Sequence, residues 1–171
     1  MNREGLAPAA DPEAPYARLG VVGLIMRRDT RSGVAERTGG QDTWLLMRPA
    51  GAIESWDPPG GRLERFEDLA EGVRREVKEE TGLSVLVAGP CYAYLTYHKG
   101  ERLVAVSMAC RVDPEGRDAD DVRPEPDVAA WGWRTAVEWE DLARRGLSSW
   151  SAADVRRVTR LVKELWEAER P

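Results

Sequence analysis

Three glutamates at close spacing are the residues best suited to chemistry in this sequence. In a helix, Glu76, Glu79 and Glu80 would occupy positions i, i+3 and i+4, which places their carboxylates on one face within one turn. Like charges at that spacing repel each other unless something neutralises them. A hard divalent cation is the expected neutraliser, because such cations take oxygen ligands. The spacing therefore predicts a cation-binding face on a helix.

The opposite face of this helix is apolar. Its residues recur every four positions and form a stripe that can pack on a sheet: Leu69, Val73 and Val77. We expect the helix to run from Phe66 to Thr81, with Gly82 supplying a left-handed cap after it. Glu67 would then begin the helix, where an anion suits the helix dipole.

The stretch from Gly61 to Leu83 resembles the Nudix box of the MutT-like hydrolases at every specified position. The box consists of Gly, five residues, Glu, seven residues, Arg-Glu-aliphatic, one residue, Glu-Glu, one residue and Gly-aliphatic, and this sequence reads GRLERFEDLAEGVRREVKEETGL. The resemblance implies an α/β fold, namely an α/β/α sandwich with a mixed central sheet. It also implies hydrolysis of a nucleoside diphosphate linked to a further group, by water attack at phosphorus. Mg²⁺ is the implied cofactor, with Mn²⁺ as a substitute.

Within that resemblance, the box residues take roles by their position. Glu76 and Glu80 are the first choices as metal ligands, and Glu79 is either a third ligand or the base that activates water. Arg75 is expected to orient these carboxylates by a bidentate contact, with an ordinary helix salt bridge as the alternative. The expected catalytic group is thus Glu79, Arg75 and Glu76. A backbone carbonyl at Gly60 or Gly61 is a further candidate ligand.

A carboxylate from a distant loop completes the metal site in many members of the family. Glu125 is the best candidate here, because it is followed by proline and then by the strand that carries Trp131 and Trp133. That pattern resembles the nucleoside triphosphate branch of the family. Asp127 is a rival ligand, and a solvated loop carboxylate is the alternative to both.

Substrate contacts are less strongly marked in the sequence. Arg48 lies where relatives often carry a basic residue that faces phosphate, and a surface arginine is the alternative. Several aromatic residues could stack on a base, although aromatics on strands more often belong to the core: Trp44, Tyr92, Tyr94 and Tyr97.

The signatures of the NADH, coenzyme A and ADP-ribose groups are missing at their expected positions, which favours substrates of the nucleoside triphosphate type. The expected substrate is a nucleoside di- or triphosphate or a related nucleotide. A nucleotide-sugar or ADP-ribose pyrophosphatase is the enzymatic alternative. A non-catalytic module that senses a nucleotide is the other alternative, although such modules usually lose box carboxylates.

Length and charge restrict the class of protein. A chain of 171 residues fits one domain, and we expect a flexible tail over 1–17 and a single domain over 18–171. The net charge of −5 argues against binding to duplex nucleic acid. No apolar run approaches the roughly 20 residues of a membrane span, and the first residues lack a signal-peptide pattern, so we expect a cytoplasmic protein without a membrane partner. A homodimer is an expectation that the resemblance alone implies.

The rest of the chain must supply the sheet that positions the box helix. Expected strands cover residues 19–27, 43–49, 84–98, 101–112 and 128–134, and expected helices cover 138–146 and 151–169. The first two strands would form a hairpin, and Lys99-Gly100 would turn a second one. That second turn would place Cys91 opposite Met108 and diagonal to Cys110, with both cysteines reduced.

Overall fold

A mixed sheet forms the centre of the protein in the computed structural model, which describes residues 18–29, 41–51, 54–98 and 101–168. Its six strands lie in the order β4-β5-β1-β2-β6, with β3 paired to β1. β1 and β5 run parallel, whereas the other pairs are antiparallel. The strands are β1 (Arg18–Asp29), β2 (Gln41–Pro49), β3 (Gly60–Arg62), β4 (Val85–His98), β5 (Glu101–Val112) and β6 (Val128–Thr135).

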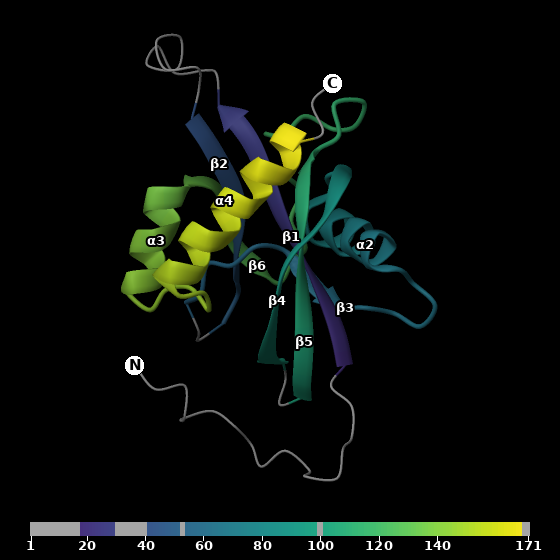
Figure 1. Cartoon of the computed structure of the whole chain (residues 1–171), viewed down its shortest axis with the longest axis horizontal. Helices are drawn as coiled ribbons and strands as arrows, with labels where there is room; N and C mark the ends of the chain where they lie inside the picture. Colours follow the sequence, from purple (N-terminus) through teal and green to yellow (C-terminus); the bar gives the residue numbers. More distant parts are fainter. Residues whose placement is uncertain (1–17, 30–40, 52–53, 99–100, 169–171) are drawn as a thin grey trace.

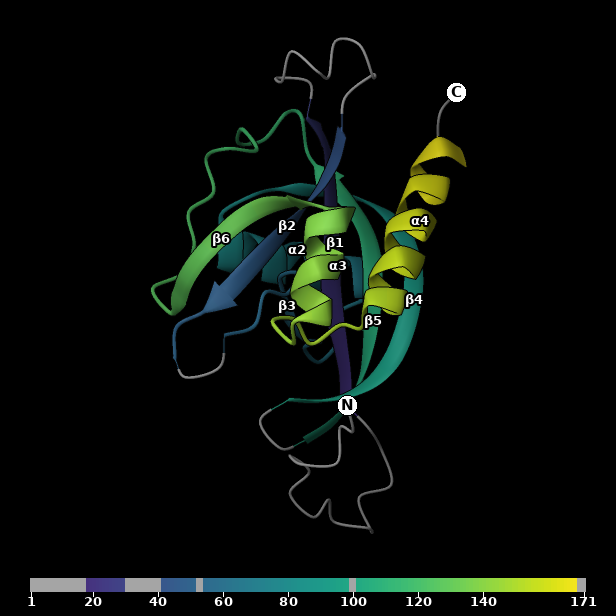
Figure 2. The same cartoon turned by 90° about the vertical axis from the view of Figure 1, so that its left-hand side faces the viewer.

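Helices cover both faces of this sheet. The box helix α2 (Leu69–Thr81) lies on one face, and α3 (Ala136–Arg144) and α4 (Ala152–Ala168) lie on the other (Figures 1 and 2). Each face has its own apolar core, one containing Val73 and Val77 of α2 and the other Val155 and Val158 of α4. The predicted α/β/α sandwich is therefore confirmed. None of the helices in the described ranges is long and apolar enough to cross a membrane.

The box helix begins three residues later than the sequence predicts. Asp68 is its N-cap and forms a capping box with Glu71, whereas Phe66 has a positive φ of 74° that a helix cannot include. The prediction that Glu67 begins the helix is therefore wrong, because this residue lies in the turn before the cap. The helix ends as expected, with Gly82 in the left-handed conformation at φ 72°.

Glycines let α2 and β3 approach the first strand closely. A Cβ atom on Gly23 would lie 2.7 Å from the Val77 Cγ2 atom of α2, so only glycine permits this helix-to-strand distance. The short strand β3 pairs with β1 from Gly60 to Arg62, and the N–H of Gly23 donates to the carbonyl of Pro59 at 2.8 Å. The box helix and the segment before it are thereby fixed to the same strand.

The hairpin of β4 and β5 follows the predicted turn but not the predicted register. His98 pairs with Glu101, which is consistent with a turn at 99–100, two residues that lie outside the described ranges. Two irregularities in β4 shift the pairing, so that Pro90 rather than Cys91 lies opposite Met108. Cys110 packs in the core beneath α2, whereas Cys91 packs against the other core, so the two cysteines do not share a face. Both are free thiols.

The other elements match their predictions to within a few residues. The first hairpin is confirmed by antiparallel pairing from Met26–Trp44 to Asp29–Gln41, whereas its loop over 30–40 and the predicted tail over 1–17 lie outside the described ranges. α3 begins at Ala136, two residues before the predicted start, because Thr135 caps it. The hydroxyl of Ser151 accepts from the N–H of Asp154 at 3.1 Å and so caps the start of the last helix, α4.

Candidate functional site

Arg75 lies at the centre of the box carboxylates. Its Nε and one terminal nitrogen donate to the two carboxylate oxygens of Glu67, at 2.7 and 3.0 Å. The same terminal nitrogen also donates to the carbonyl of Arg62 at 3.0 Å. The other terminal nitrogen donates to Glu76 at 2.9 Å and to Glu79 at 3.1 Å. This arrangement connects the turn before the helix, the strand β3 and two box glutamates through one guanidinium.

Glu67 is the bidentate partner of Arg75 and does not cap the helix. Its hydrogen bonds with Arg75 lower its pKa to about 2, so the carboxylate stays ionised, and the same bonds raise the pKa of Arg75. The N–H of Glu64 also donates to Glu67, at 2.9 Å. Glu67 therefore fixes Arg75, which in turn holds Glu76 and Glu79.

The pKa of Glu80 is shifted in the opposite direction from that of Glu67. Burial raises its pKa to about 7, and the charges of Glu76, Glu125 and Asp127 add to the effect, although the hydrogen bond from the N–H of Gly60 at 3.1 Å opposes it. The pKa of Glu76 is also raised, again chiefly by burial. Two partly buried carboxylates with raised pKa values are therefore adjacent on the face of α2 towards β3.

Gly61 leaves the space that the Glu76 carboxylate occupies. A Cβ atom at position 61 would lie 2.5 to 2.6 Å from the three carboxylate atoms of Glu76. Any side chain there would displace this carboxylate. The first glycine of the box is thus required by direct contact between β3 and α2.

The loop before β6 approaches the C-terminal half of α2. The N–H of Arg123 donates to the carbonyl of Thr81 at 2.8 Å, which ties the loop to the end of the helix. Glu125 and Asp127 are both exposed, and both lie near enough to raise the pKa of Glu80 by their charge. The structure therefore brings both predicted loop carboxylates towards the box.

The donor set at this site suits a hard divalent cation. It consists of carboxylate oxygens, and two of the carboxylates are partly buried groups whose pKa values are raised and whose charged forms a cation would stabilise. Within the described ranges, however, no three Asp, Glu, Cys or His side chains are already gathered to hold a metal ion. Because Arg75 holds Glu76 and Glu79, a cation would compete with its guanidinium for these two carboxylates.

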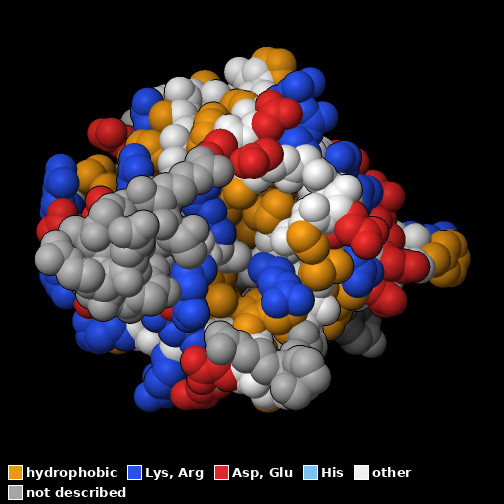
Figure 3. Space-filling model, turned by 90° about the horizontal axis from the view of Figure 1, so that it is seen from above, with side chains coloured by type: hydrophobic (Ala, Val, Ile, Leu, Met, Phe, Trp, Pro, Cys, Tyr) orange, Lys and Arg blue, Asp and Glu red, His pale blue; other side chains and the backbone are white. Residues whose placement is uncertain are grey.

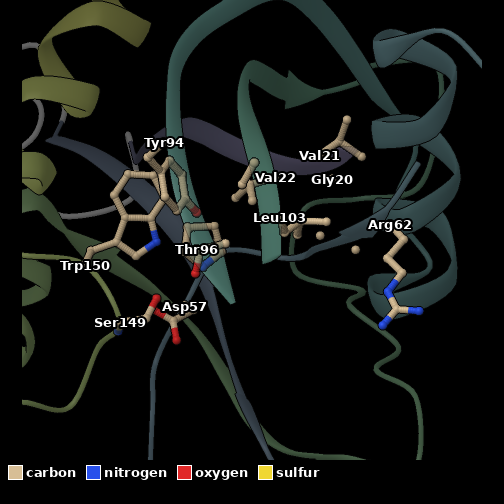
Figure 4. A pocket seen from close by; sticks show the side chains of 14 residues that line it. Gly20, Val21, Val22, Asp57, Arg62, Tyr94, Thr96, Leu103, Ser149 and Trp150 are labelled. Atoms are coloured by element: carbon tan, nitrogen blue, oxygen red, sulfur yellow. Dashed lines mark hydrogen bonds between the residues drawn. The ribbon is translucent and has the colours of Figure 1, made fainter. Parts of the chain in front are cut away.

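A pocket of about 220 Å³ adjoins the Gly60-Gly61 segment. Tyr94 and Trp150 form an aromatic wall at one end, and Arg62 lies at the other end (Figure 4). Val22 and Leu103 lie between these two ends (Figure 4). The pocket thus offers aromatic surface for a base and a guanidinium for an anionic group, next to the box carboxylates.

The predicted substrate residues do not all reach this pocket. Tyr94 lines it, and its ring centroid lies 5.0 Å from that of Trp150 in an edge-on arrangement. Trp44 is only 1% exposed and belongs to the core beneath α3 and α4. The expectation that it stacks on a base is therefore wrong, and Trp44 is a core residue. The side chain of Tyr97 lies outside the described residues.

Arg48 lies on the sheet face away from the box helix. Strand side chains alternate, so Arg48 shares the face of Leu46, which packs in the core beneath α3 and α4. Its guanidinium carbon lies 5.9 Å from the ring centroid of Trp56. The structure therefore does not bring Arg48 together with the box glutamates.

Three residues of the site were missed by sequence reasoning. Arg62 belongs to the box stretch but to none of its specified positions, and Trp150 lies far along the chain between two helices. Asp57 precedes the Pro-Pro-Gly-Gly run and joins the pocket lining. Its place directly before the prolines was the one available signal, and nothing in the sequence paired it with residues near 150.

Charges of both signs are mixed on the molecular surface. Figure 3 shows basic and acidic side chains interspersed with apolar ones over the described residues of one face, rather than one continuous basic area.

Comparison with known proteins gives a consistent result. The NUDIX domain family model matches residues 26–155. A Caenorhabditis elegans protein named as nudix hydrolase 1 is 36% identical over 81 residues, which is 43% of this chain and 22% of that protein. The match thus spans about a fifth of the length of this curated relative.

Solved structures show the same fold. A C. elegans Ap4A hydrolase in a binary complex has a TM-score of 0.66 at 17% identity, over 86% of this chain and 99% of that one. A NUDIX hydrolase from Nitrosomonas europaea has a TM-score of 0.59 at 19% identity, over 90% of each chain. A MutT NUDIX hydrolase from Burkholderia pseudomallei has a TM-score of 0.54 at 25% identity, over 72% of this chain and 86% of that one.

Proposed function

This chain belongs to the NUDIX domain family, and we propose that it is a Mg²⁺-dependent hydrolase that cleaves a phosphoanhydride bond of a nucleoside di- or triphosphate or a related nucleotide. One observation carries the proposal: the complete set of box carboxylates, held by Arg75 and by the N–H of Gly60, adjoins a pocket with an aromatic wall. The site thus combines groups for phosphate chemistry with a surface for a base.

Glu76 and Glu80 are the groups that we assign to the metal, with Glu79, Glu125 and the carbonyl of Gly60 as further ligands. When bound, Mg²⁺ would neutralise charge on the phosphate oxygens and lower the pKa of a bound water. The raised pKa values of Glu76 and Glu80 fit this role, because both groups gain from a neighbouring cation when they ionise.

Glu79 is the candidate for the base that activates water, or else a third ligand. Its side chain is 51% exposed, so solvent reaches it, and Arg75 orients it through a hydrogen bond of 3.1 Å. A general base must lie within hydrogen-bond reach of its water and hold a fixed direction, and Arg75 supplies that direction. Arg75 is accordingly a positioning residue in this proposal.

The pocket would hold the nucleotide between its two ends. Tyr94 and Trp150 would contact the base, since every base has a face that can meet an aromatic ring. Arg62 would then contact a phosphate at the opposite end, on the side of the box helix (Figure 4). Because structures of an Ap4A hydrolase share the fold, a dinucleoside polyphosphate belongs among the substrates to be tested.

A turnover screen with product identification tests this proposal. The protein is incubated with Mg²⁺ and a panel of nucleoside di- and triphosphates, a nucleotide sugar, ADP-ribose and diadenosine tetraphosphate. We expect at least one to be hydrolysed, and turnover to stop when the metal is chelated. Tight binding of a nucleotide without turnover of any would instead identify a sensing module.

Glu80→Gln is the variant that ties the activity to this site. We expect turnover to fall by on the order of 10³-fold, because loss of a metal ligand removes several kcal/mol of charge stabilisation. The fold should persist, since the neutral amide replaces a carboxylate that burial already disfavours. Glu167→Gln, the same change at an exposed position of α4, is the matched control. Unchanged turnover in Glu80→Gln would contradict the assignment of Glu80 as a metal ligand of the active site.

A further inference from the structure

Asp57 connects the segment before the box to the connection between α3 and α4. Its Oδ1 atom accepts from the hydroxyl of Ser148 and from the hydroxyl and N–H of Ser149, each at 2.9 Å. Its Oδ2 atom accepts from the hydroxyl of Ser55 at 2.5 Å. An ionised carboxylate has about four acceptor sites. Three of these bonds converge on Oδ1 and one reaches Oδ2, so most of the acceptor sites of this carboxylate are used within the protein although the residue lines the pocket.

The backbone fixes Asp57 relative to the box. Asp57 and Met47 exchange two backbone hydrogen bonds of 2.8 and 2.9 Å, which hold it against β2. Gly60 follows three residues later, and its N–H donates to Glu80 at 3.1 Å. A displacement of Asp57 would therefore also displace the backbone near Gly60, where the box carboxylates lie.

Ser148 connects Asp57 to the aromatic wall of the pocket. Its hydroxyl oxygen accepts from the indole N–H of Trp139 at 3.2 Å and from the backbone N–H of Trp150 at 3.3 Å. The Trp150 ring then meets Tyr94, with 5.0 Å between the ring centroids. One hydrogen-bonded path thus runs from Asp57 through Ser148 to the wall of the pocket.

We propose that Asp57 is a positioning residue that holds the Trp150 wall of the pocket at a fixed place relative to the Gly60–Glu80 edge. It acts on the substrate through Trp150 and determines how well a bound base lies against the wall while its phosphates lie at the box. This inference rests on the proposed function, because it concerns the same pocket and the same nucleotide.

Steady-state kinetics of Asp57→Asn and Ser148→Ala test the inference. Both variants break the path, so we expect KM for the best nucleotide of the panel to rise about tenfold while kcat stays within about twofold. Ser55→Ala is the matched control, because it removes a bond to the same carboxylate on the side away from Trp150. KM in this control should stay at the wild-type value.

A further comparison separates positioning from mere support of the fold. In a Trp150→Leu background the indole ring that Asp57 is proposed to position is already absent, so adding Asp57→Asn should raise KM no further. Additive effects in this pair would overturn the inference, as would a wild-type KM in a folded Ser148→Ala protein. If the wild type binds a nucleotide without turnover, Kd replaces KM in the same comparisons. A wild type that neither binds nor hydrolyses any nucleotide would overturn the proposed function and this inference together.

Discussion

At the scale of single residues, the surroundings of the Glu80 carboxyl raise its pKa. The pKa of this carboxyl rises from its ordinary 4.5 to about 7, first because it is buried and then because other carboxylates surround it. Arg75, the nearby cation, donates to Glu67, Glu76 and Glu79. The charge on Glu80 is therefore the one that a bound cation would stabilise most.

The stability of the metal-free protein should depend on pH through Glu80. Below pH 4.5 the group is protonated in both the folded and unfolded states and contributes no difference. Between pH 4.5 and about 7 the unfolded state releases the proton while the folded state keeps it, so stability falls as pH rises, by ~3 kcal/mol in total. The loss is complete above that window.

Unfolding by denaturant with a chelator present, at pH 5 and pH 8, checks this expectation. Other groups titrate in both proteins, so the informative quantity is the difference between Glu80→Gln and the wild type. The free energy of unfolding of Glu80→Gln should increase relative to that of the wild type as pH rises. Mg²⁺ should reduce this difference at pH 8. A gap that is the same at both pH values would show that Glu80 ionises normally in the folded protein.

At the scale of elements, the distances from α2 to β1 and β3 depend on glycine. Gly61 faces the carboxylate of Glu76, whereas Gly23 faces the Val77 side chain in the core. The same small change at these two positions therefore meets a movable polar group in one case and a packed apolar group in the other. The sequence marks Gly61 as the first glycine of the box, whereas nothing in it singles out Gly23.

Gly61→Ala should reduce activity and leave stability nearly unchanged. The added Cβ atom would push the Glu76 carboxylate aside, and we expect turnover to fall by at least about tenfold with less than about 1 kcal/mol lost in unfolding free energy. Gly23→Ala is the contrasting variant and should cost about 1–3 kcal/mol of stability through overpacking. Turnover assays and denaturant unfolding of both variants give the comparison. Full activity in Gly61→Ala would show that Glu76 does not need its observed position.

At the scale of the whole molecule, the pocket joins segments that are far apart in the chain. Tyr94 comes from β4, Arg62 from β3 and Trp150 from the connection before α4. The sheet brings β4 and β3 to the same region, because β4 pairs with β5, β5 pairs with β1 and β1 pairs with β3. If this pocket holds the nucleotide as proposed, substrate specificity depends on the assembled domain.

Tyr94→Leu should raise KM for the preferred nucleotide about fivefold or more, because stacking on an aromatic ring contributes about 1–3 kcal/mol per base. The kcat value should change little, since Tyr94 lies at the end of the pocket away from Arg62 (Figure 4). Tyr92→Phe is the matched control, because Tyr92 donates to Asp154 at 2.9 Å and does not line the pocket. Equal KM values for Tyr94→Leu and the wild type would place the base elsewhere.

The sequence by itself determined the family, the fold class and the box. The family model, the relatives and the mixed sheet confirm these predictions, because the box residues and the hydrophobic periods are local patterns. The metal ligands, the roles of Glu79 and Glu125, the single domain and the homodimer remain predictions. The start of α2 was misplaced because the capping box at Asp68 overrides the apolar period.

Only the tertiary structure decided which residues meet across the fold. The burial of Trp44, the separation of Cys91 from Cys110 and the position of Arg48 follow from strand alternation and from bulges, which a single sequence does not reveal. The hydrogen bond between Ser148 and Asp57 joins residues that are 91 positions apart, and no local sequence pattern predicts it. Chemistry that depends on spacing within one helix can therefore be predicted from the sequence. The pocket that would select the substrate forms only when the strands pack into the sheet, so only the tertiary structure reveals it.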